Sequence, residues 1–479
     1  MKKSIIILGS LLMLLAVSSC KKVIDVKETD FIGGDIALKT VANNQQGIIG
    51  AYAAMNVEMG ILINSVFSDE VKVAEFYNAA TNHEWQYAST DIGLRDNYTA
   101  FPLYYRIIDR VNRVLIALPL APSTGAADDA LKLRLKGEAL FLRAFAHFEL
   151  YRYYSNSALG TDLALAYMET PSLETKERIT VAPYFQKLKA DLTEAKALLP
   201  TATTDIYRAT RAAAVGLQAR VALYLKEYAD AVTFTNDYIS TLPLASAAAF
   251  PSIWSDASNA EIAFKLSRTP SLGTKIGSLY RGTSAISAGV TNIGTVTWRP
   301  SDKLWDSYDQ VNDVRFNAYF KVEALLTATS RSPRLIFKYA GTAYATPGEN
   351  VADAKVFRTG EMFLIRAEAK AENNDLAGAA ADLNALRTAR ITGYVNETFA
   401  SKDVLIAAIM NERFKELAFE GHRFWDLKRR NLPVNRLAAD APNAAAMTLS
   451  AGNFRFLLPI PNSEIQANPK IQQNPGYTN

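Results

Sequence analysis

The spacing of hydrophobic residues predicts helices over most of this chain. Apolar positions three or four residues apart, the spacing of one buried helix face, recur in several long segments. These segments are 40–55, 98–118, 128–154, 181–199, 208–238, 365–387 and the stretch that begins at Lys402. Segment 128–154 has apolar residues on nearly every side, which indicates a helix buried inside the protein. The chain is therefore predicted to be mainly α-helical.

Two long segments lack this periodicity. Residues 71–97 place aromatic residues among Asn, Thr and Ser, and residues from about 241 to 356 are dominated by Ser, Gly, Thr and Pro, compositions typical of loops. Short strands are expected inside the second segment, as at Arg334–Tyr339. Long connections in a compact protein are usually functional. The tail from Pro459 contains prolines that exclude a regular helix, so it is expected to wrap the body.

Two of the helical segments share a pattern of small and apolar residues. Sliding one onto the other pairs Leu217 with Ile365, Ala219 with Ala367, Tyr228 with Leu376, Ala231 with Ala379, and Asn236 with Asn384. Small residues at fixed places let two antiparallel helices pack closely, as in tetratricopeptide repeats. The alternative, two unrelated Ala-rich helices, stays open, because such a composition is common.

The N-terminus predicts a lipid anchor. Lys2 and Lys3 precede an apolar run, Ile5–Val17, which would span only about 20 Å as a helix, short of a membrane core. It therefore indicates a signal peptide. Val17-Ser18-Ser19-Cys20 looks like a bacterial lipobox, so Cys20 is expected to carry a diacylglycerol and a third, N-linked acyl chain such as palmitate, which anchor stably. The alternative is a secretory signal with a chance cysteine.

Composition and motifs exclude several classes of function. The chain of 479 residues is 49% hydrophobic with a net charge of +4, which argues against a nucleic-acid binder. It has one cysteine and three histidines, and neither HExxH, a phosphate loop nor a G-x-S-x-G elbow occurs. No metal, cofactor or catalytic residue is therefore assigned, although 48 acidic residues always allow a hydrolase pair to be nominated.

The stretch Asn411–Asn431 carries charges of opposite sign at intervals of three. Its charged residues are Arg413, Glu416, Glu420, Arg423, Asp426 and Arg429. Residues three apart on a helix are neighbours, so these form a ladder of ion pairs in a structural helix. Gly421 either ends a helix there or admits another backbone. The sharper alternative is a catalytic cluster of Glu420, His422 and Asp426.

This stretch resembles the C-terminal signature of the RagB/SusD family of outer-membrane nutrient-binding lipoproteins. The resemblance rests on Glu412-Arg413, Glu416–Gly421, Arg423 and Asp426-Leu427, and the tail Pro459–Tyr477 is similar to the ending of the same family. It implies a body of tetratricopeptide-like helix pairs. It also implies a partner, a SusC-type TonB-dependent transporter, and a glycan ligand, with peptides as the runner-up.

Aromatic residues in the two loop segments are the candidate ligand contacts. Trp85 and Tyr87 lie in the first segment, and Tyr280 and Trp298 in the second. Aromatic faces suit the apolar C–H faces of sugars, and in RagB/SusD proteins the ligand surface is an arc of such rings from loops. For each ring the alternative is packing into the body, because large aromatics are usually buried.

The predicted organisation has three parts: a signal peptide (1–19), a lipid-anchored tether (20–39) and one α-helical domain (40–479). The domain divides into an N-terminal part (about 40–240), a loop-rich region (about 241–355) and a signature part (about 356–479). The predicted function is capture of a glycan at the outer face of the outer membrane, without catalysis, and its delivery to the transporter. A helical-repeat scaffold without a nutrient ligand and a lipid-anchored hydrolase are the alternatives.

Overall fold

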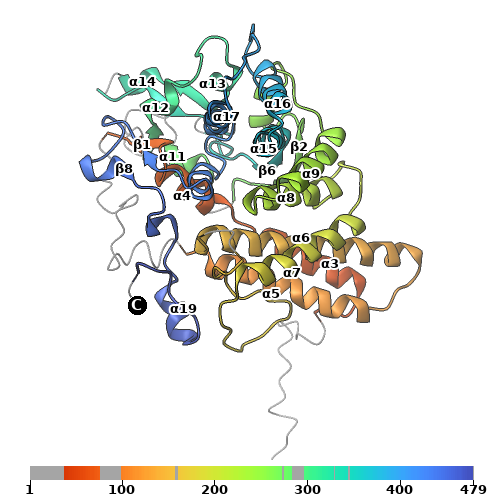
Figure 1. The fold of residues 1–479 in the computed structure, drawn as a ribbon. Coiled ribbons are helices and arrows are strands. Elements are labelled where there is room, and N and C mark those ends of the chain that lie inside the picture. Colours follow the sequence, from red (N-terminus) through yellow and green to blue (C-terminus); the bar gives the residue numbers. More distant parts are fainter. Residues whose placement is uncertain are drawn as a thin grey trace, which may run out of the picture.

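The computed structural model describes residues 37–75, 99–156, 160–271, 275–282, 296–327, 330–342 and 346–477. The protein is mainly α-helical, as predicted. Figure 1 shows a lower group of long helices and an upper group, with short strands and short helices beside the upper group. The lower group is α3 (Val41–Ala53), α5 (Phe101–Ala117), α6 (Ala126–Tyr154) and α7 (Val181–Leu198); the upper group is α8 (Arg211–Tyr224), α9 (Tyr228–Thr241), α15 (Thr359–Glu372), α16 (Leu376–Thr388) and α17 (Lys402–Glu416).

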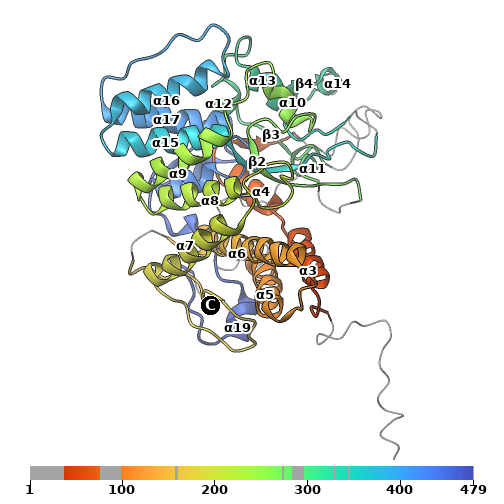
Figure 2. The same cartoon turned by 90° about the vertical axis from the view of Figure 1, so that its right-hand side faces the viewer.

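Helix α6 is the centre of the lower group. It packs against α3, α5 and α7, and Figure 2 shows it among these helices. Every residue from Gly137 to Tyr154 is buried, which confirms that its apolar residues face all sides. At Gly137 a Cβ atom would lie 3.0 Å from Leu198 Cβ, so glycine allows the end of α7 to approach α6 closely.

The two repeated segments form two helical hairpins, α8–α9 and α15–α16. The predicted helix 208–238 is broken at Lys226, whose φ is 60°, and Asn374 occupies the equivalent turn with φ 63°. Four of the five predicted residue pairs match in burial; Asn236 is exposed, whereas Asn384 is buried. Helix α15 packs against α9, so the hairpins stack in the tetratricopeptide manner.

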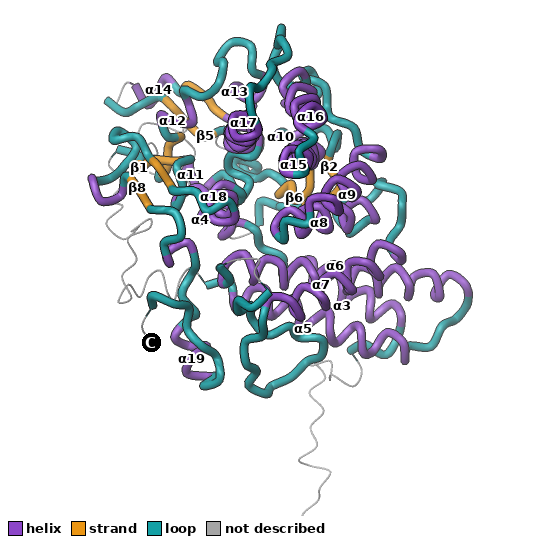
Figure 3. Tube along the Cα trace, in the orientation of Figure 1, coloured by secondary structure: helices purple, strands orange, loops and turns teal. Residues whose placement is uncertain are grey.

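The loop-rich region contains more regular structure than its composition predicts. Figure 3 shows short helices and strands there. The helices are α10 (Phe250–Trp254), α11 (Ser278–Arg281), α12 (Asp302–Trp305), α13 (Val314–Tyr319) and α14 (Ala324–Thr327). The strands form antiparallel pairs: β1 (Val71–Val73) with β3 (Trp298–Pro300), β2 (Ile262–Leu266) with β6 (Ala354–Arg358), β4 (Phe320–Val322) with β5 (Arg334–Ile336), and β7 (Val434–Asn435) with β8 (Thr448–Leu449). Strand β5 lies within the predicted strand segment.

The signature stretch is not one helix. Helix α17 ends at Glu416, and α18 begins at Arg423 and ends at Arg429. Between them Phe419 and Gly421 have φ of 62° and 82°. A Cβ at Gly421 would lie 3.4 Å from Ile61 N in α4 (Glu58–Val66), an ordinary contact. The positive φ, rather than crowding, therefore requires glycine at this break.

The Pro-rich tail wraps the lower group, as predicted. Leu458 N donates to Tyr153 O (3.0 Å), and Arg178 donates to Asn474 Oδ1 (2.8 Å). The tail carries α19 (Asn462–Ala467), which lies below the signature elements, near α5. One stretch, Val41–Val66, is apolar and long enough to span a membrane by composition. The structure divides it into α3 and α4, and both helices contribute buried residues to the core.

Candidate functional site

The two predicted ligand segments are joined to one edge of the β1–β3 pair. Val73 pairs with Trp298 in antiparallel register, and Ala74 N donates to Thr297 O (3.0 Å). The end of β1 therefore lies beside the beginning of β3. Two separate segments adjoin this edge along the chain. Residues 76–98 follow β1, and residues 283–295 precede β3. We call it the β1–β3 edge, comprising residues 73–75 and 296–298.

The predicted aromatic contacts have different outcomes. Trp85 and Tyr87 lie outside the described residues, as does Cys20. Tyr280 is fully buried, and Trp298 is 5% exposed, so the prediction that these two rings stack on a ligand is not supported. Tyr280 packs against Phe419, with ring centroids 5.4 Å apart, because pairing with β1 draws this part of the chain into the core.

These buried residues support the edge instead. Thr297 N donates to Tyr280 O (2.9 Å), and Thr297 Oγ1 donates to Leu279 O (2.9 Å). Helix α11 is thereby fixed to the start of β3. Arg299 forms an ion pair with Glu75 (2.9 Å), although burial lowers the pKa of Arg299. Four buried apolar residues also pack together beside the edge, in a separate cluster of Ala74, Val296, Leu326 and Leu335. Hydrogen bonds, an ion pair and apolar contacts therefore hold the two strand ends of the edge in the body.

Two adjacent acidic residues, Asp69 and Glu70, precede β1, and their pKa values are shifted in opposite directions. Burial opposes ionisation of Asp69, but Arg423 (2.8 Å) and Lys303 (2.6 Å) hold its pKa well below its usual range. Burial raises the pKa of Glu70 to about 7. Sequence reasoning missed both residues. The sequence feature that could have identified them is a pair of carboxylates directly after an apolar run, where burial is expected to shift a pKa.

Ser65 connects Glu70 to the base of the edge. Ser65 Oγ donates to Glu70 Oε2 (2.8 Å) and lies 2.9 Å from the Tyr280 hydroxyl. Phe419 N also donates to Glu70 Oε2 (3.3 Å). Glu70 Oε1 is buried without a hydrogen-bond partner. The protein therefore supplies hydrogen bonds to only one of the two buried carboxyl oxygens, which disfavours the ionised form and explains the raised pKa of Glu70.

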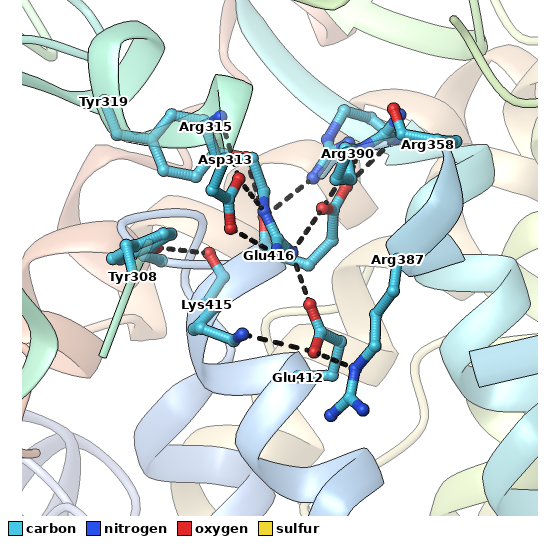
Figure 4. A network of polar contacts seen from close by, with 12 residues as sticks. Tyr308, Asp313, Arg315, Tyr319, Arg358, Arg387, Arg390, Glu412, Lys415 and Glu416 are labelled. Atoms are coloured by element: carbon cyan, nitrogen blue, oxygen red, sulfur yellow. Dashed lines mark hydrogen bonds and ion pairs between the residues drawn. The ribbon is translucent and has the colours of Figure 1, made fainter. Parts of the chain in front are cut away.

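The signature charges form a buried network (Figure 4). Glu416 contacts three guanidinium groups, those of Arg315 (3.1 Å), Arg358 (3.0 Å) and Arg390 (3.1 Å). Glu412 contacts Arg315 (2.6 Å) and Arg387 (2.7 Å). Burial opposes the ionised forms, but the surrounding cations hold the pKa of both carboxylates well below the usual range. The network joins α17 to α13, α16 and β6.

Most pairs of the predicted ladder are replaced by contacts between distant residues. Asp426 and Arg429 do pair (2.7 Å). Arg413 instead contacts Asp426, thirteen residues on (2.8 Å), and Arg423 contacts Asp69. The break at residues 417–422 changes the direction of the helix, so residues after it no longer lie above those before it.

The alternative catalytic cluster does not assemble. Glu420 is held by Lys338 (2.7 Å) and Arg358 (2.7 Å), whereas Asp426 is held by Arg413 and Arg429. The carboxylate next to His422 is that of Glu361, 3.9 Å away. In the part of the chain that the structure describes, no group of three His, Cys, Asp or Glu residues could hold a metal ion. The signature is therefore structural.

His147 is a core residue. Its ring stacks on Tyr167, with centroids 3.8 Å apart, and Met168 N donates to Nε2 (3.2 Å). Nδ1 lies 3.1 Å from the Tyr184 hydroxyl. Burial lowers its pKa to about 3, so the ring is neutral at physiological pH.

These features define a tetratricopeptide-like helical protein in which the β1–β3 edge joins residues 76–98 and residues 283–295 to the body. The family model described as "SusD family" matches residues 290–477, and the model described as "starch-binding associating with outer membrane" matches residues 24–223. The chain belongs to the RagB/SusD family.

Relatives and solved structures share this fold over nearly the whole chain. A SusD-like protein of Formosa agariphila is 24% identical, covering 96% of both chains. A SusD superfamily structure from Bacteroides thetaiotaomicron has a TM-score of 0.78 at 24% identity, over 91% of this chain and 100% of that one. A SusD-like carbohydrate-binding protein from Bacteroides vulgatus has a TM-score of 0.75 at 21% identity, over 90% of this chain and 97% of that one.

Proposed function

We propose that this protein captures a glycan at the outer surface of the outer membrane and delivers it to a SusC-type TonB-dependent transporter. The observation that carries the proposal is the β1–β3 edge, from which residues 76–98, the segment with the candidate contacts Trp85 and Tyr87, leave the body. Membership in a family with a starch-binding model supports the ligand class, as does a structural neighbour described as carbohydrate-binding.

The proposed ligand contacts are Trp85 and Tyr87. A sugar ring presents an apolar C–H face that stacks on an aromatic side chain, while its hydroxyl groups bond to polar neighbours. Tyr280 and Trp298 act below this surface, as buried supports of the edge. The mechanism is capture and transfer, in which no covalent bond is made or broken.

The proposed anchor is Cys20, with residues 20–39 as a tether and residues 40–479 as one domain. Three acyl chains at Cys20 hold a protein at a membrane stably, whereas one chain gives marginal binding. The transporter is the proposed partner, and the tethered domain covers it from outside.

The first experiment measures glycan binding by a soluble protein that begins at Lys21. It is titrated calorimetrically with a panel of polysaccharides and oligopeptides, beside Trp85→Ala. Tyr207→Ala is the matched control, because Tyr207 is an aromatic residue that is 43% exposed and belongs to the segment before α8. We expect one class of glycan to bind without turnover, with at least tenfold weaker binding by Trp85→Ala and unchanged binding by the control.

The other outcomes separate the alternatives. Binding that survives in Trp85→Ala would keep the function but remove the proposed contact. Binding of peptides alone would replace the ligand class. Tight association with the transporter and binding of no nutrient would contradict capture and leave a helical-repeat scaffold.

A further inference from the structure

A pocket lies on the lower group of helices, between α5, residues 166–178 and α19. Its volume is about 320 Å³, which is within the range of small-ligand sites. The apolar wall consists of Phe101, Tyr105, Ile108, Met168 and Ile471. No residue of the β1–β3 edge is among the described residues that line it.

The carboxylate of Glu464 lines this pocket without a partner. Among the residues that the structure describes, none forms a hydrogen bond or an ion pair with its side chain, and burial raises its pKa. The signature carboxylates Glu412 and Glu416 each contact two or more cations. Glu464 lies in the first turn of α19, where a negative charge is favourable, but that role does not require a pocket in front of it.

Aromatic rings stand beside this carboxylate. The rings of Phe101 and Tyr105 are 5.5 Å apart with an interplanar angle of 42°. The Tyr105 hydroxyl donates to Ala166 O (3.1 Å), so the ring is held in place. Tyr105 and Glu464 both line the pocket, and after burial itself the charge of Glu464 is the largest cause of the raised pKa of Tyr105. A carboxylate beside aromatic faces is a favourable environment for an organic cation.

The rest of the lining is polar, and it includes the charged residues Asp109, Glu174, Lys176 and Arg178. Both cations have partners of their own, because Lys176 pairs with Glu174 (2.6 Å) and Arg178 donates to Asn474 Oδ1 (2.8 Å) and to backbone carbonyl groups.

Its neutral polar residues are Thr170, Ser172, Thr175 and Asn468. Asn468 Nδ2 donates to Lys176 O (2.7 Å) and Ser172 Oγ accepts from Glu174 N (3.1 Å), which leaves the two threonine hydroxyl groups for a ligand. A sugar ring has hydroxyl groups that can form hydrogen bonds with these threonine hydroxyl groups, whereas the aliphatic stem of a lysine side chain has none.

We propose that the α5–α19 pocket binds an amino sugar, with its ammonium group against the Glu464 carboxylate and its apolar ring face against Tyr105. This site does not depend on Trp85 or on the β1–β3 edge. It would give the protein a preference for glycans that contain a free amine.

The test titrates the protein that begins at Lys21 with a trisaccharide of glucosamine and with its fully N-acetylated counterpart, at low ionic strength. We expect the amine form to bind at least tenfold more tightly, because acetylation removes the charge. Glu464→Gln should weaken binding of the amine form at least tenfold. The matched control, Glu177→Gln, neutralises an exposed glutamate nearby and should leave binding unchanged.

Further variants and probes make the test decisive. Ala467→Trp fills the pocket from an exposed position on α19 and should also weaken binding at least tenfold. Trp85→Ala should leave binding of the amine form unchanged, so failure of the proposed glycan surface and failure of this pocket give different results. The proposal is wrong if Glu464→Gln binds the amine form like the wild type, or if both trisaccharides bind equally or not at all. It is also wrong if Nα-acetyl-lysine amide, which has a free side-chain ammonium group but no sugar ring, binds as tightly as the glucosamine trisaccharide.

Discussion

Acidic side chains in this protein fall into two groups with opposite environments. The paired carboxylates Asp69, Glu412 and Glu416 are buried among two or more cations each. The single carboxylates Glu70 and Glu464 have no ion-pair partner among the described residues, and burial raises the pKa of both. Removing a paired carboxylate leaves cations unpaired in a low-dielectric interior. Removing a single one relieves a desolvation cost. The comparison separates the charges that hold the fold from those that are available for binding or for response to pH.

The largest expected effect comes from Glu416→Gln. The substitution keeps the shape of the side chain but leaves Arg315, Arg358 and Arg390 around a neutral group. Breaking a buried ionic cluster costs about 3–5 kcal/mol, measured as the free energy of unfolding in urea. Glu169→Gln is the control, because its carboxylate is 49% exposed and pairs with Lys187; its cost should stay below about 1 kcal/mol. Similar losses of unfolding free energy in Glu416→Gln and Glu169→Gln would contradict the distinction between buried and exposed carboxylates.

The next effect concerns Asp69→Asn. Asp69 holds Arg423 and Lys303, so the variant should lose about 2–4 kcal/mol of unfolding free energy at pH 7. The pKa of Asp69 is lowered in the folded state, so its contribution is present above the unfolded pKa, near 4, and is lost as the pH falls below that value. Urea unfolding at pH 7 and pH 3 should show a smaller difference from the wild type at pH 3.

Glu70→Gln should change stability in the opposite direction, although Glu70 is the next residue. The folded pKa is about 7 against an ordinary value of 4.5, so the folded state binds the proton more tightly. Wild-type stability relative to the variant therefore falls as the pH rises from about 4.5 to 7 and stays low above pH 7. The variant should gain up to about 3 kcal/mol at pH 8, since one pKa unit corresponds to about 1.4 kcal/mol.

The measurement for Glu70→Gln is urea unfolding of both proteins between pH 4.5 and 8. His147 has a lowered pKa and adds a pH dependence of the opposite sign, but it does so in both proteins, so the difference between them isolates Glu70. A difference that does not change with pH would show that Glu70 does not titrate in this range.

Local patterns explain what the sequence predicts well. The hairpins α8–α9 and α15–α16 follow from small residues at helical spacing, and their turns fall where the two patterns align, at Lys226 and Asn374. The burial of α6 follows from its apolar residues on all sides. The loop segments could be found by their loss of periodicity, although the short strands within them depend on pairing with distant residues.

Contacts between distant residues explain what the sequence does not predict. The charge ladder required one continuous helix, and the positive φ at Phe419 and Gly421 breaks it. Arg423 then contacts Asp69, 354 residues earlier, a pairing that no local spacing encodes. The burial of Tyr280 depends on its contact with Phe419. Glu464 stands in a Pro-punctuated tail, where sequence reasoning predicted wrapping but no pocket.

The smallest effect, and the one that sharpens the comparison most, is expected for the stability of Glu464→Gln. No cation loses its partner in this variant, and solvent screens a partly exposed carboxylate. The unfolding free energy at pH 7 should therefore stay within about 0.5 kcal/mol of the wild type. Because the folded pKa is raised, any difference should favour the variant at neutral pH and disappear as the pH falls below about 4.5, the unfolded value. Thermal unfolding at pH 7 and pH 4 checks both statements, with Glu177→Gln as the exposed control. A loss near that of Glu416→Gln would mean that Glu464 holds the tail in place, and would move it from the single to the paired group.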